Sequence, residues 1–175
     1  MGRLLHDTFT EDLMLLNVVP ADPMDALQLA PRLRDGDKAE VRAMGHTPFN
    51  ALMEAFDLPD AEVFSIIEVE DEDDEEAGGE VIAMFGVSTS PDAPEHGVPW
   101  MLASPQLETY SKQFLRYCRT WVDRLQERYE VLYNLVHCQN TQGLRWLQWC
   151  GFEVQTKTKY GSGGEEFYLF TRERK

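Results

Sequence analysis

Residues 138–154 read CQNTQGLRWLQWCGFEV, and the fold expected for the whole chain follows from this stretch. The pair Asn140-Thr141 is a typical helix start, because a short polar side chain accepts hydrogen bonds from backbone N–H groups that the first turn leaves free. Gly151 is a typical helix end, since glycine readily adopts the left-handed conformation. Three apolar residues at helical spacing predict a buried inner face: Leu144, Leu147 and Cys150. A short, sharply bounded helix between two buried strands is therefore expected.

Outward from this helix, the spacing of apolar residues predicts the remaining elements. Recurrence at helical spacing indicates helices, and short runs rich in β-branched and aromatic residues indicate strands. The expected helices cover 26–36, 37–44, 48–58, 107–128 and 141–150. The expected strands cover 13–19, 61–69, 80–87, 98–103, 131–138, 152–156 and 166–171.

This order predicts one α/β domain over residues 1–175. Because helices and strands are intermixed along the chain, we expect a mixed central sheet of about six to seven strands with helices on both faces. Residues 1–12 are expected to form an N-terminal extension, and residues 70–79 an acidic hairpin loop.

The chain carries 31 acidic and 16 basic residues, a net charge of −15. Nucleic-acid binding through phosphates needs a basic face, so this balance argues against nucleic acid as a partner. The excess is densest at 68–76 (EVEDEDDEE), which predicts a solvated loop, with a basic protein partner as the alternative. Three cysteines without metal-ligand spacing predict reduced thiols, no metal site and a cytosolic protein. No apolar run approaches the ~20 residues of a membrane helix, so no membrane contact is expected.

The strand–helix–strand unit that ends in Gly-Phe resembles the GCN5-related N-acetyltransferase (GNAT) family, and the likeness spans about residues 14–172. Asn140 stands where the family has Asn, Gly143 where it has a small residue, and Gly151-Phe152 where it has Gly-Phe. The resemblance implies a GNAT-like fold. The family Tyr that often protonates the thiolate of coenzyme A falls on Leu147, which has no proton to give.

The family's phosphate loop, between the fourth strand and the long helix, also departs from its pattern. Glycines there let backbone N–H groups approach the pyrophosphate at a helix N-terminus. Gln106 matches the first position, but Thr109 and Ser111 stand at the two small positions, and Glu108 adds a negative charge. The resemblance therefore leaves a vestigial loop of Gln106, Thr109 and Ser111, together with Asn140, as the candidate cofactor-binding residues.

For a general base the sequence offers Glu95 and His96, which precede the strand at 98–103, near the place where this fold often has a Glu. Ordinary polar loop residues are the competing interpretation. His137 lies between Val136 and Cys138 in an expected strand. Alternation places no carboxylate beside it, so a core or edge histidine is expected.

The C-terminal part of the chain is also similar to the internal virion proteins of short-tailed, podovirus-type phages, a family with a degenerate GNAT fold. The residues that carry this likeness are PWMLASPQ at 99–106, YEVLYN at 129–134, the Asn140-Thr141 turn and FYLFT at 167–171. The resemblance implies a virion-associated structural or assembly protein without a cofactor, which contacts other phage proteins in the host cytoplasm or the virion. The alternative is an N-acetyltransferase that uses acetyl-CoA.

Overall fold

The computed structural model describes residues 3–4, 15–69 and 79–175. Within these ranges, eight strands form one mixed sheet in the order β1-β2-β3-β4-β5-β6-β8-β7. Seven of them are long, as the sequence predicts, and β1 adds a two-residue edge. The strands are β1 Arg3–Leu4, β2 Leu15–Pro20, β3 Glu62–Val69, β4 Val81–Thr89, β5 His96–Ala103, β6 Val131–His137, β7 Glu153–Tyr160 and β8 Glu165–Glu173.

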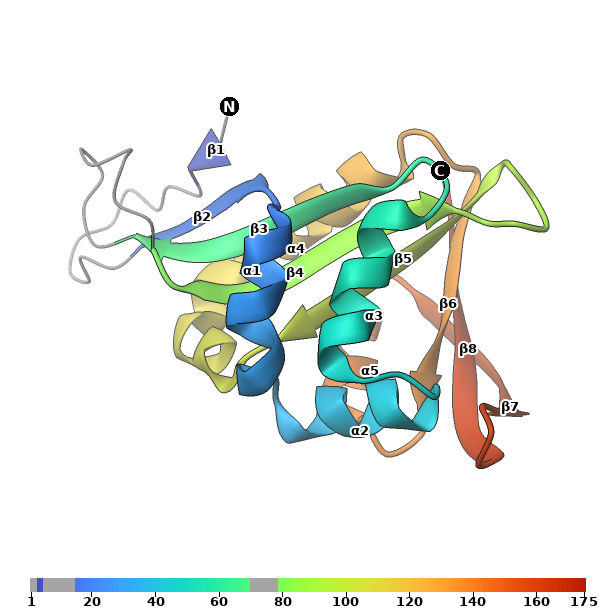
Figure 1. The fold of residues 1–175 in the computed structure, drawn as a ribbon. Helices are drawn as coiled ribbons and strands as arrows, with labels where there is room; N and C mark the ends of the chain where they lie inside the picture. Colours follow the sequence, from blue (N-terminus) through green and yellow to red (C-terminus); the bar gives the residue numbers. More distant parts are fainter. Residues whose placement is uncertain (1–2, 5–14, 70–78) are drawn as a thin grey trace.

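Helices cover both faces of this sheet, which confirms the expected fold class. Helices α1 and α3 lie on one face, and α4 and α5 lie on the other (Figure 1). The helices are α1 Pro23–Leu29, α2 Asp35–Ala43, α3 Pro48–Glu54, α4 Ser111–Gln126 and α5 Thr141–Trp149. Three short 3-10 segments, η1 Ala30–Arg32, η2 Ala55–Asp57 and η3 Pro105–Tyr110, join them to their neighbours.

Local signals set the ends of α5. The side chain of Asn140 accepts a hydrogen bond of 3.0 Å from the backbone N–H of Gly143, so the Asn is the N-cap. Gly151 has a φ of +85°, the left-handed conformation that ends the helix. Leu147 and Cys150 are buried on its inner face. The bounds predicted for this helix are therefore confirmed.

The predicted helix at 107–128 begins later than its apolar pattern indicates. Residues 105–110 form the tighter η3, and α4 starts only at Ser111. The reason is tertiary: the Ser104 hydroxyl donates 3.0 Å to the carbonyl of Ile82, and Leu107 is 4% exposed. Because these contacts tie the segment to β4, a 3-10 turn replaces the first α-helical turn.

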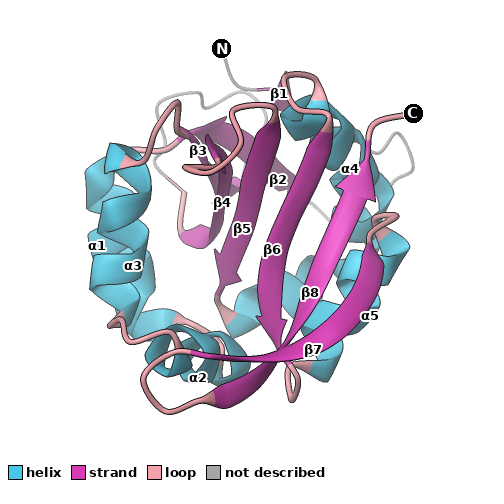
Figure 2. Cartoon of the chain, turned by 90° about the vertical axis from the view of Figure 1, so that its right-hand side faces the viewer, coloured by secondary structure: helices cyan, strands magenta, loops and turns pink. Residues whose placement is uncertain are grey.

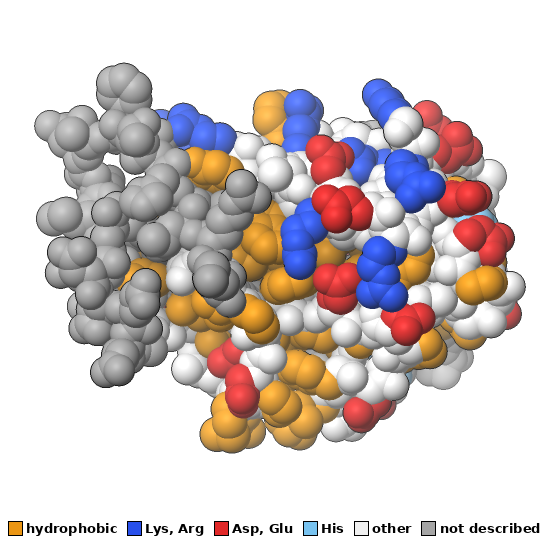
Figure 3. All heavy atoms as spheres, turned by 90° about the horizontal axis from the view of Figure 1, so that it is seen from above, with side chains coloured by type: hydrophobic (Ala, Val, Ile, Leu, Met, Phe, Trp, Pro, Cys, Tyr) orange, Lys and Arg blue, Asp and Glu red, His pale blue; other side chains and the backbone are white. Residues whose placement is uncertain are grey.

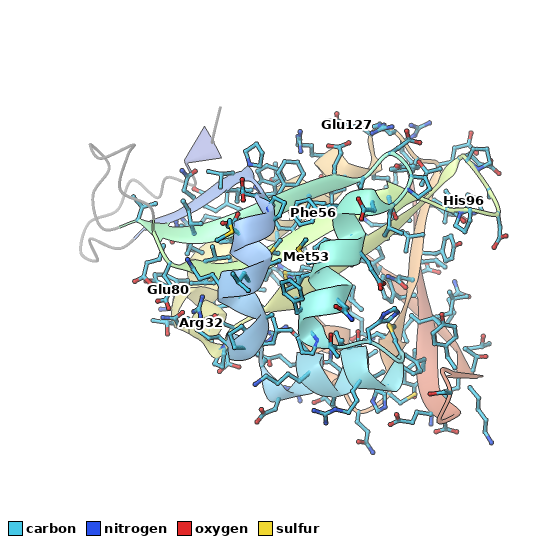
Figure 4. All side chains as sticks on the ribbon, in the orientation of Figure 1. Arg32, Met53, Phe56, Glu80, His96 and Glu127 are labelled. Atoms are coloured by element: carbon cyan, nitrogen blue, oxygen red, sulfur yellow. The ribbon has the colours of Figure 1, made fainter. Side chains whose placement is uncertain are left out.

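Two apolar cores lie on opposite faces of the sheet. The larger one packs α4 and α5 against the strands, and it includes Val18, Ile66, Cys118, Leu125 and Phe170. The smaller one packs α1 and α3 against the other face, where Met53 and Phe56 lie beside it (Figure 4). Both cores reach β5, so this strand links the two sides of the molecule.

Two of the sequence predictions fall mostly on residues that the structure leaves undescribed. Of the N-terminal extension, only Arg3–Leu4 is described, and it pairs antiparallel with β2. Of the acidic hairpin loop, only Gly79 is described. In the described part of the chain, no helix has both the length and the apolar character needed to cross a membrane.

Charges of both signs lie side by side on part of the face seen in Figure 3, where Lys and Arg side chains neighbour Asp and Glu, and hydrophobic side chains occupy another part. Ion pairs join β3 to α4 and to the residues just after it: Arg124 of α4 lies 3.8 Å from Glu62, and Arg128, past the end of α4, lies 3.1 Å from the same carboxylate. Because the two signs are interleaved, the described part of this face presents no uniform basic surface.

Candidate functional site

A gap between β5 and β6 divides the sheet. The two strands are parallel and pair at His96↔Val131 and Gly97↔Leu132. Beyond these pairs they diverge toward α2, as Figure 2 shows. The hydrogen-bonding edges of both strands therefore face a space that no neighbouring strand fills.

The edge of β5 turns polar backbone groups into this gap. The backbone N–H of Ser104 donates a hydrogen bond of 2.8 Å to the carbonyl of Ile82 in β4. Along a pair of antiparallel strands, residue pairs that exchange backbone hydrogen bonds alternate with pairs that do not. With the observed register, the backbone groups of Pro99, Met101 and Ala103 therefore point away from β4 and toward β6. The Asn134 side chain on β6 donates 2.9 Å to the carbonyl of Pro99.

Helix α2 crosses the open end of the gap with two carboxylates. Asp37 accepts a hydrogen bond of 2.9 Å from the backbone N–H of Ala103 at the end of β5. Glu40, one turn later, accepts 3.1 Å from the backbone N–H of His137 at the end of β6. Glu40 also accepts 3.0 Å from the side-chain amide of Asn140. One helix thus holds the ends of both diverging strands.

Burial controls the electrostatics of these two acids. Asp37 is 4% exposed and forms an ion pair of 3.0 Å with Arg34. Its burial raises the pKa of the carboxyl above the ordinary value, against the opposing attraction of Arg34. Burial also raises the pKa of Glu40, while the hydrogen bonds from Asn140 and His137 oppose that rise. The site therefore contains two acids that take up protons more readily than exposed carboxyls.

A cavity of about 280 Å³ passes through the gap. On one side of the sheet it is bounded by α2 and α3, where Asp37 and Glu40 line it. On the other side it reaches the apolar face of α4. Among the residues there are Phe114, Cys118, Trp121, Val122 and Leu125. The charged side chains thus lie on the α2 side of the sheet, beside apolar residues such as Val41 and Ala51, whereas the side chains from α4 carry no charge.

A second cavity, of about 330 Å³, lies between η3, α4 and α5. Phe114 and Trp146 line both cavities, and their rings stack across the boundary with centroids 5.6 Å apart. Ser111 and Arg145 line its outer part. Glu108 also lines it and accepts 3.1 Å from the side chain of Gln142. We call this second cavity the outer groove.

The candidate cofactor-binding residues from the sequence do not stay together. Asn140 lines the cavity and Ser111 lines the outer groove. Gln106 instead accepts 3.1 Å from Arg32 and donates 2.8 Å to Glu80. Arg32 and Glu80 form an ion pair of 2.8 Å on the β4 side (Figure 4). Thr109 is exposed and lines neither cavity.

The candidate bases Glu95 and His96 lie where β5 and β6 still pair, and neither lines the cavity. Figure 4 places His96 at the opposite end of the molecule from Arg32. Its ring packs edge-on against Tyr133, with centroids 5.9 Å apart.

The expectation for His137 was wrong in one respect. Its imidazole Nε2 lies 3.0 Å from the carboxylate of Glu165 on β8, so it does have an acidic partner. Alternation within one strand cannot reveal this contact, because the carboxylate comes from the neighbouring strand.

Sequence reasoning also missed the acids of α2. Asp37, Glu40 and Val41 recur at helical spacing, so two acids share a face with a buried Val. An acid on the apolar face of a helix is the signal that could have found them. In the ranges that the structure describes, no group of three or more His, Cys, Asp or Glu side chains could hold a metal ion.

The fold is that of the GNAT acetyltransferases. A GCN5-related N-acetyltransferase from Kribbella flavida has a TM-score of 0.63 at 16% identity, covering 91% of this chain and 98% of that one. The GNAT acetyltransferase from Streptococcus pneumoniae has a TM-score of 0.57 at 12% identity, with coverages of 91% and 99%. AAC(6')-Ib, in a structure with ribostamycin and coenzyme A, has a TM-score of 0.64 at 11% identity, with coverages of 91% and 93%.

At these identities the likeness shows the fold alone. No protein-family model matches the chain, and no curated protein matches its sequence. The expected likeness to phage internal virion proteins therefore has no support from the comparisons, whereas the expected GNAT fold is confirmed.

Proposed function

We propose that this protein is an N-acyltransferase that uses a coenzyme A thioester and takes acetyl-CoA as its simplest donor. The observation that carries the proposal is the gap between β5 and β6, where the N–H and C=O of Met101 face a cavity. The pantetheine arm of coenzyme A contains two amides, and an amide can pair with an open strand edge as a further strand does. Structural neighbours that contain coenzyme A, such as AAC(6')-Ib, share the fold.

Most of the residues around the gap suit the pantetheine arm of coenzyme A, and one opposes its phosphates. Met101 supplies an edge donor and an edge acceptor, and Asn140 supplies a side-chain amide. Arg145 and Ser111 line the outer groove and favour an anionic group, whereas Glu108 opposes one. The donor brings an activated thioester, which is the chemistry that an acyl transfer to an amine needs.

The acids of α2 give the acceptor side its character. Asp37 and Glu40 line the cavity on the α2 side, where a protonated amine would be attracted to them. Glu40 is the carboxylate in position to accept a proton from that amine. Burial raises its pKa toward neutral pH, where a carboxylate is a better general base. Leu147 has no proton to donate, so protonation of the departing sulfur is left to solvent.

Calorimetric titration with acetyl-CoA tests the proposal, and we expect micromolar affinity. Met101→Pro removes the edge N–H that faces the gap, and it leaves the β4 ladder intact because this N–H does not point to β4. Met101→Ala shortens the same side chain but keeps the N–H. We expect the Pro variant to lose at least about tenfold in affinity relative to the Ala variant, the scale of a lost hydrogen bond. Equal affinities for the two variants, or no heat when the wild type is titrated with acetyl-CoA or with longer acyl-CoA thioesters, would refute the proposal.

A second candidate is a non-catalytic assembly protein that acts by contacts with other virion proteins, in the host cytoplasm or the particle. One observation favours it: Asp37 and Glu40 already satisfy donors at the end of each strand, so the protein closes its own gap. This candidate requires that acetyl-CoA does not bind. It also requires that the protein co-purifies with virion components, which mass spectrometry of particles would detect.

A further inference from the structure

The cavity extends beyond the gap and into the core between α4 and the sheet. We propose that this inner part, the acyl chamber, holds a straight acyl chain of about six to eight carbons, so that the preferred donor is a medium-chain acyl-CoA rather than acetyl-CoA. The inference rests on the proposed function, because it assigns the group that the thioester carries. The chamber is defined by Val18, Ile66, Phe85, Cys118, Val122 and Leu125.

The walls of the acyl chamber are continuous and apolar. Val18 and Ile66 are direct cross-strand partners on β2 and β3, and Phe85 lies on the next strand. Opposite them, α4 presents Val122 one turn before Leu125. Each of these five side chains is at most 7% exposed. A pocket with such walls gains affinity from hydrocarbon and has little to offer a charged group.

The charged residues of the cavity stay on the other side of the sheet. Asp37 and Glu40 belong to α2 and bond to the ends of β5 and β6. A thioester in the gap therefore separates two environments: a cationic acceptor amine is favoured on the α2 side, and a hydrocarbon chain on the α4 side. Apolar residues such as Val41 and Ala51 also line the α2 side, but only the α4 side offers the chain walls without a charged group.

The volume sets the length of that chain. An apolar cavity of about 150 Å³ holds one benzene, which has six carbons. The whole cavity is about 280 Å³, of which the gap next to Met101 and Asn140 and the α2 side next to Asp37 and Val41 each take a part. The remainder has room for roughly six to eight carbons at the same packing. An acetyl group would leave most of it empty, although protein interiors are close-packed.

Calorimetric titration with coenzyme A, acetyl-CoA, butanoyl-CoA, hexanoyl-CoA, octanoyl-CoA and dodecanoyl-CoA tests the inference on binding alone. Each buried methylene raises affinity by up to about fourfold. We expect octanoyl-CoA to bind at least about tenfold more tightly than acetyl-CoA, and dodecanoyl-CoA to gain nothing further, because the chamber is then full. Equal affinities for acetyl-CoA and octanoyl-CoA would overturn the inference and leave the proposed function standing. An absence of binding by every thioester would overturn both.

A substitution that fills the acyl chamber can be compared with the same substitution outside it. Val122→Phe places a ring in the chamber, and Val154→Phe makes the same change on β7, at a residue that lines neither cavity. We expect Val122→Phe to weaken octanoyl-CoA binding by at least about tenfold while changing acetyl-CoA binding by less than about threefold. The Val154→Phe variant should bind both donors as the wild type does.

A smaller filling substitution guards against misfolding. Val122→Ile adds only one methylene to the same wall, and it should shift the preferred chain toward hexanoyl-CoA. If both filling variants fold and keep the wild-type preference for octanoyl-CoA, the chain does not enter this chamber and the inference is wrong.

Discussion

The Glu40 carboxylate accepts a hydrogen bond of 3.0 Å from the Asn140 side chain, across 100 positions of sequence. Asn140 is also the N-cap of α5, so its Oδ1 and Nδ2 atoms bind two different elements. The residue that starts the helix after β6 is therefore also the residue that holds α2 over the end of the gap. A change at Glu40 consequently affects both the stability of the molecule and the shape of its site.

Replacing Glu40 separates its charge from its hydrogen bonds. Glu40→Ala leaves the N–H of His137 and the amide of Asn140 without their acceptor, which we expect to lower the free energy of unfolding by about 1–3 kcal/mol. Glu40→Gln keeps an acceptor oxygen for both donors and should be at least as stable as the wild type. Urea denaturation at pH 7 measures the two differences. A Gln variant as unstable as the Ala variant would contradict this account.

The difference in unfolding free energy between the wild type and Glu40→Gln should also depend on pH. Burial raises the pKa of Glu40 above its ordinary value of 4.5, so the folded protein holds this proton more tightly than the unfolded chain. The resulting stabilisation is complete below the unfolded pKa and is lost as the pH rises through the folded one. Unfolding of the wild type relative to Glu40→Gln should therefore become easier from pH 4.5 upward. A stability difference that is constant between pH 4 and pH 8 would show that Glu40 does not titrate there.

A second prediction concerns Cys118 and Cys150, whose sulfur atoms lie 3.4 Å apart in the core. The hydrogen bond from the Cys150 thiol lowers the pKa of Cys118 and raises that of Cys150. One equivalent of hydrogen peroxide should join the two sulfurs, with the two thiol hydrogens and the peroxide leaving as two water molecules. Thiol titration should then fall from three groups to one, and peptide mapping should find Cys138 still reduced.

Two serine variants check this assignment. Cys138→Ser should still form the bond and lose both remaining thiols, whereas Cys150→Ser should keep two titratable thiols after the same treatment. A disulfide that includes Cys138 in the folded wild type would contradict the prediction.

Local chemistry explains which elements could be predicted from the sequence. Asn140 and Gly151 mark the ends of α5 through their own side chain and backbone, so neighbouring residues suffice to place them. The start of α4 could not be placed in this way. It depends on the bond from Ser104 to Ile82 and on the burial of Leu107, both of which involve a strand more than twenty positions away.

The candidate site was harder to predict for the same reason. Asn140 was found because it belongs to a local motif. Asp37 and Glu40 bind Ala103 and Asn140, which lie 66 and 100 positions away, so their role appears only once the strands have diverged. Glu95 and His96, by contrast, have the right chemistry for a base, but the fold places them where β5 and β6 are still paired.

The final prediction tests how the β7–β8 hairpin supports α2. Gly161 and Gly164 both have a left-handed φ, at +77° and +60°. A Cβ on Gly161 would lie 2.1 Å from the carbonyl oxygen of Ala43, the last residue of α2, whereas a Cβ on Gly164 would have no neighbour within 4 Å. Gly164→Ala should therefore cost about 1 kcal/mol of unfolding free energy from backbone strain alone.

Gly161→Ala carries the same strain and must also displace the backbone of α2, so we expect a further loss of at least about 1 kcal/mol. Amide hydrogen exchange in α2 should quicken in Gly161→Ala and stay unchanged in Gly164→Ala, because only the first substitution pushes on Ala43. Since α2 carries both carboxylates of the site, Gly161→Ala should also weaken whatever binds in the gap. Equal stability and equal exchange in the two variants would show that the hairpin does not brace α2.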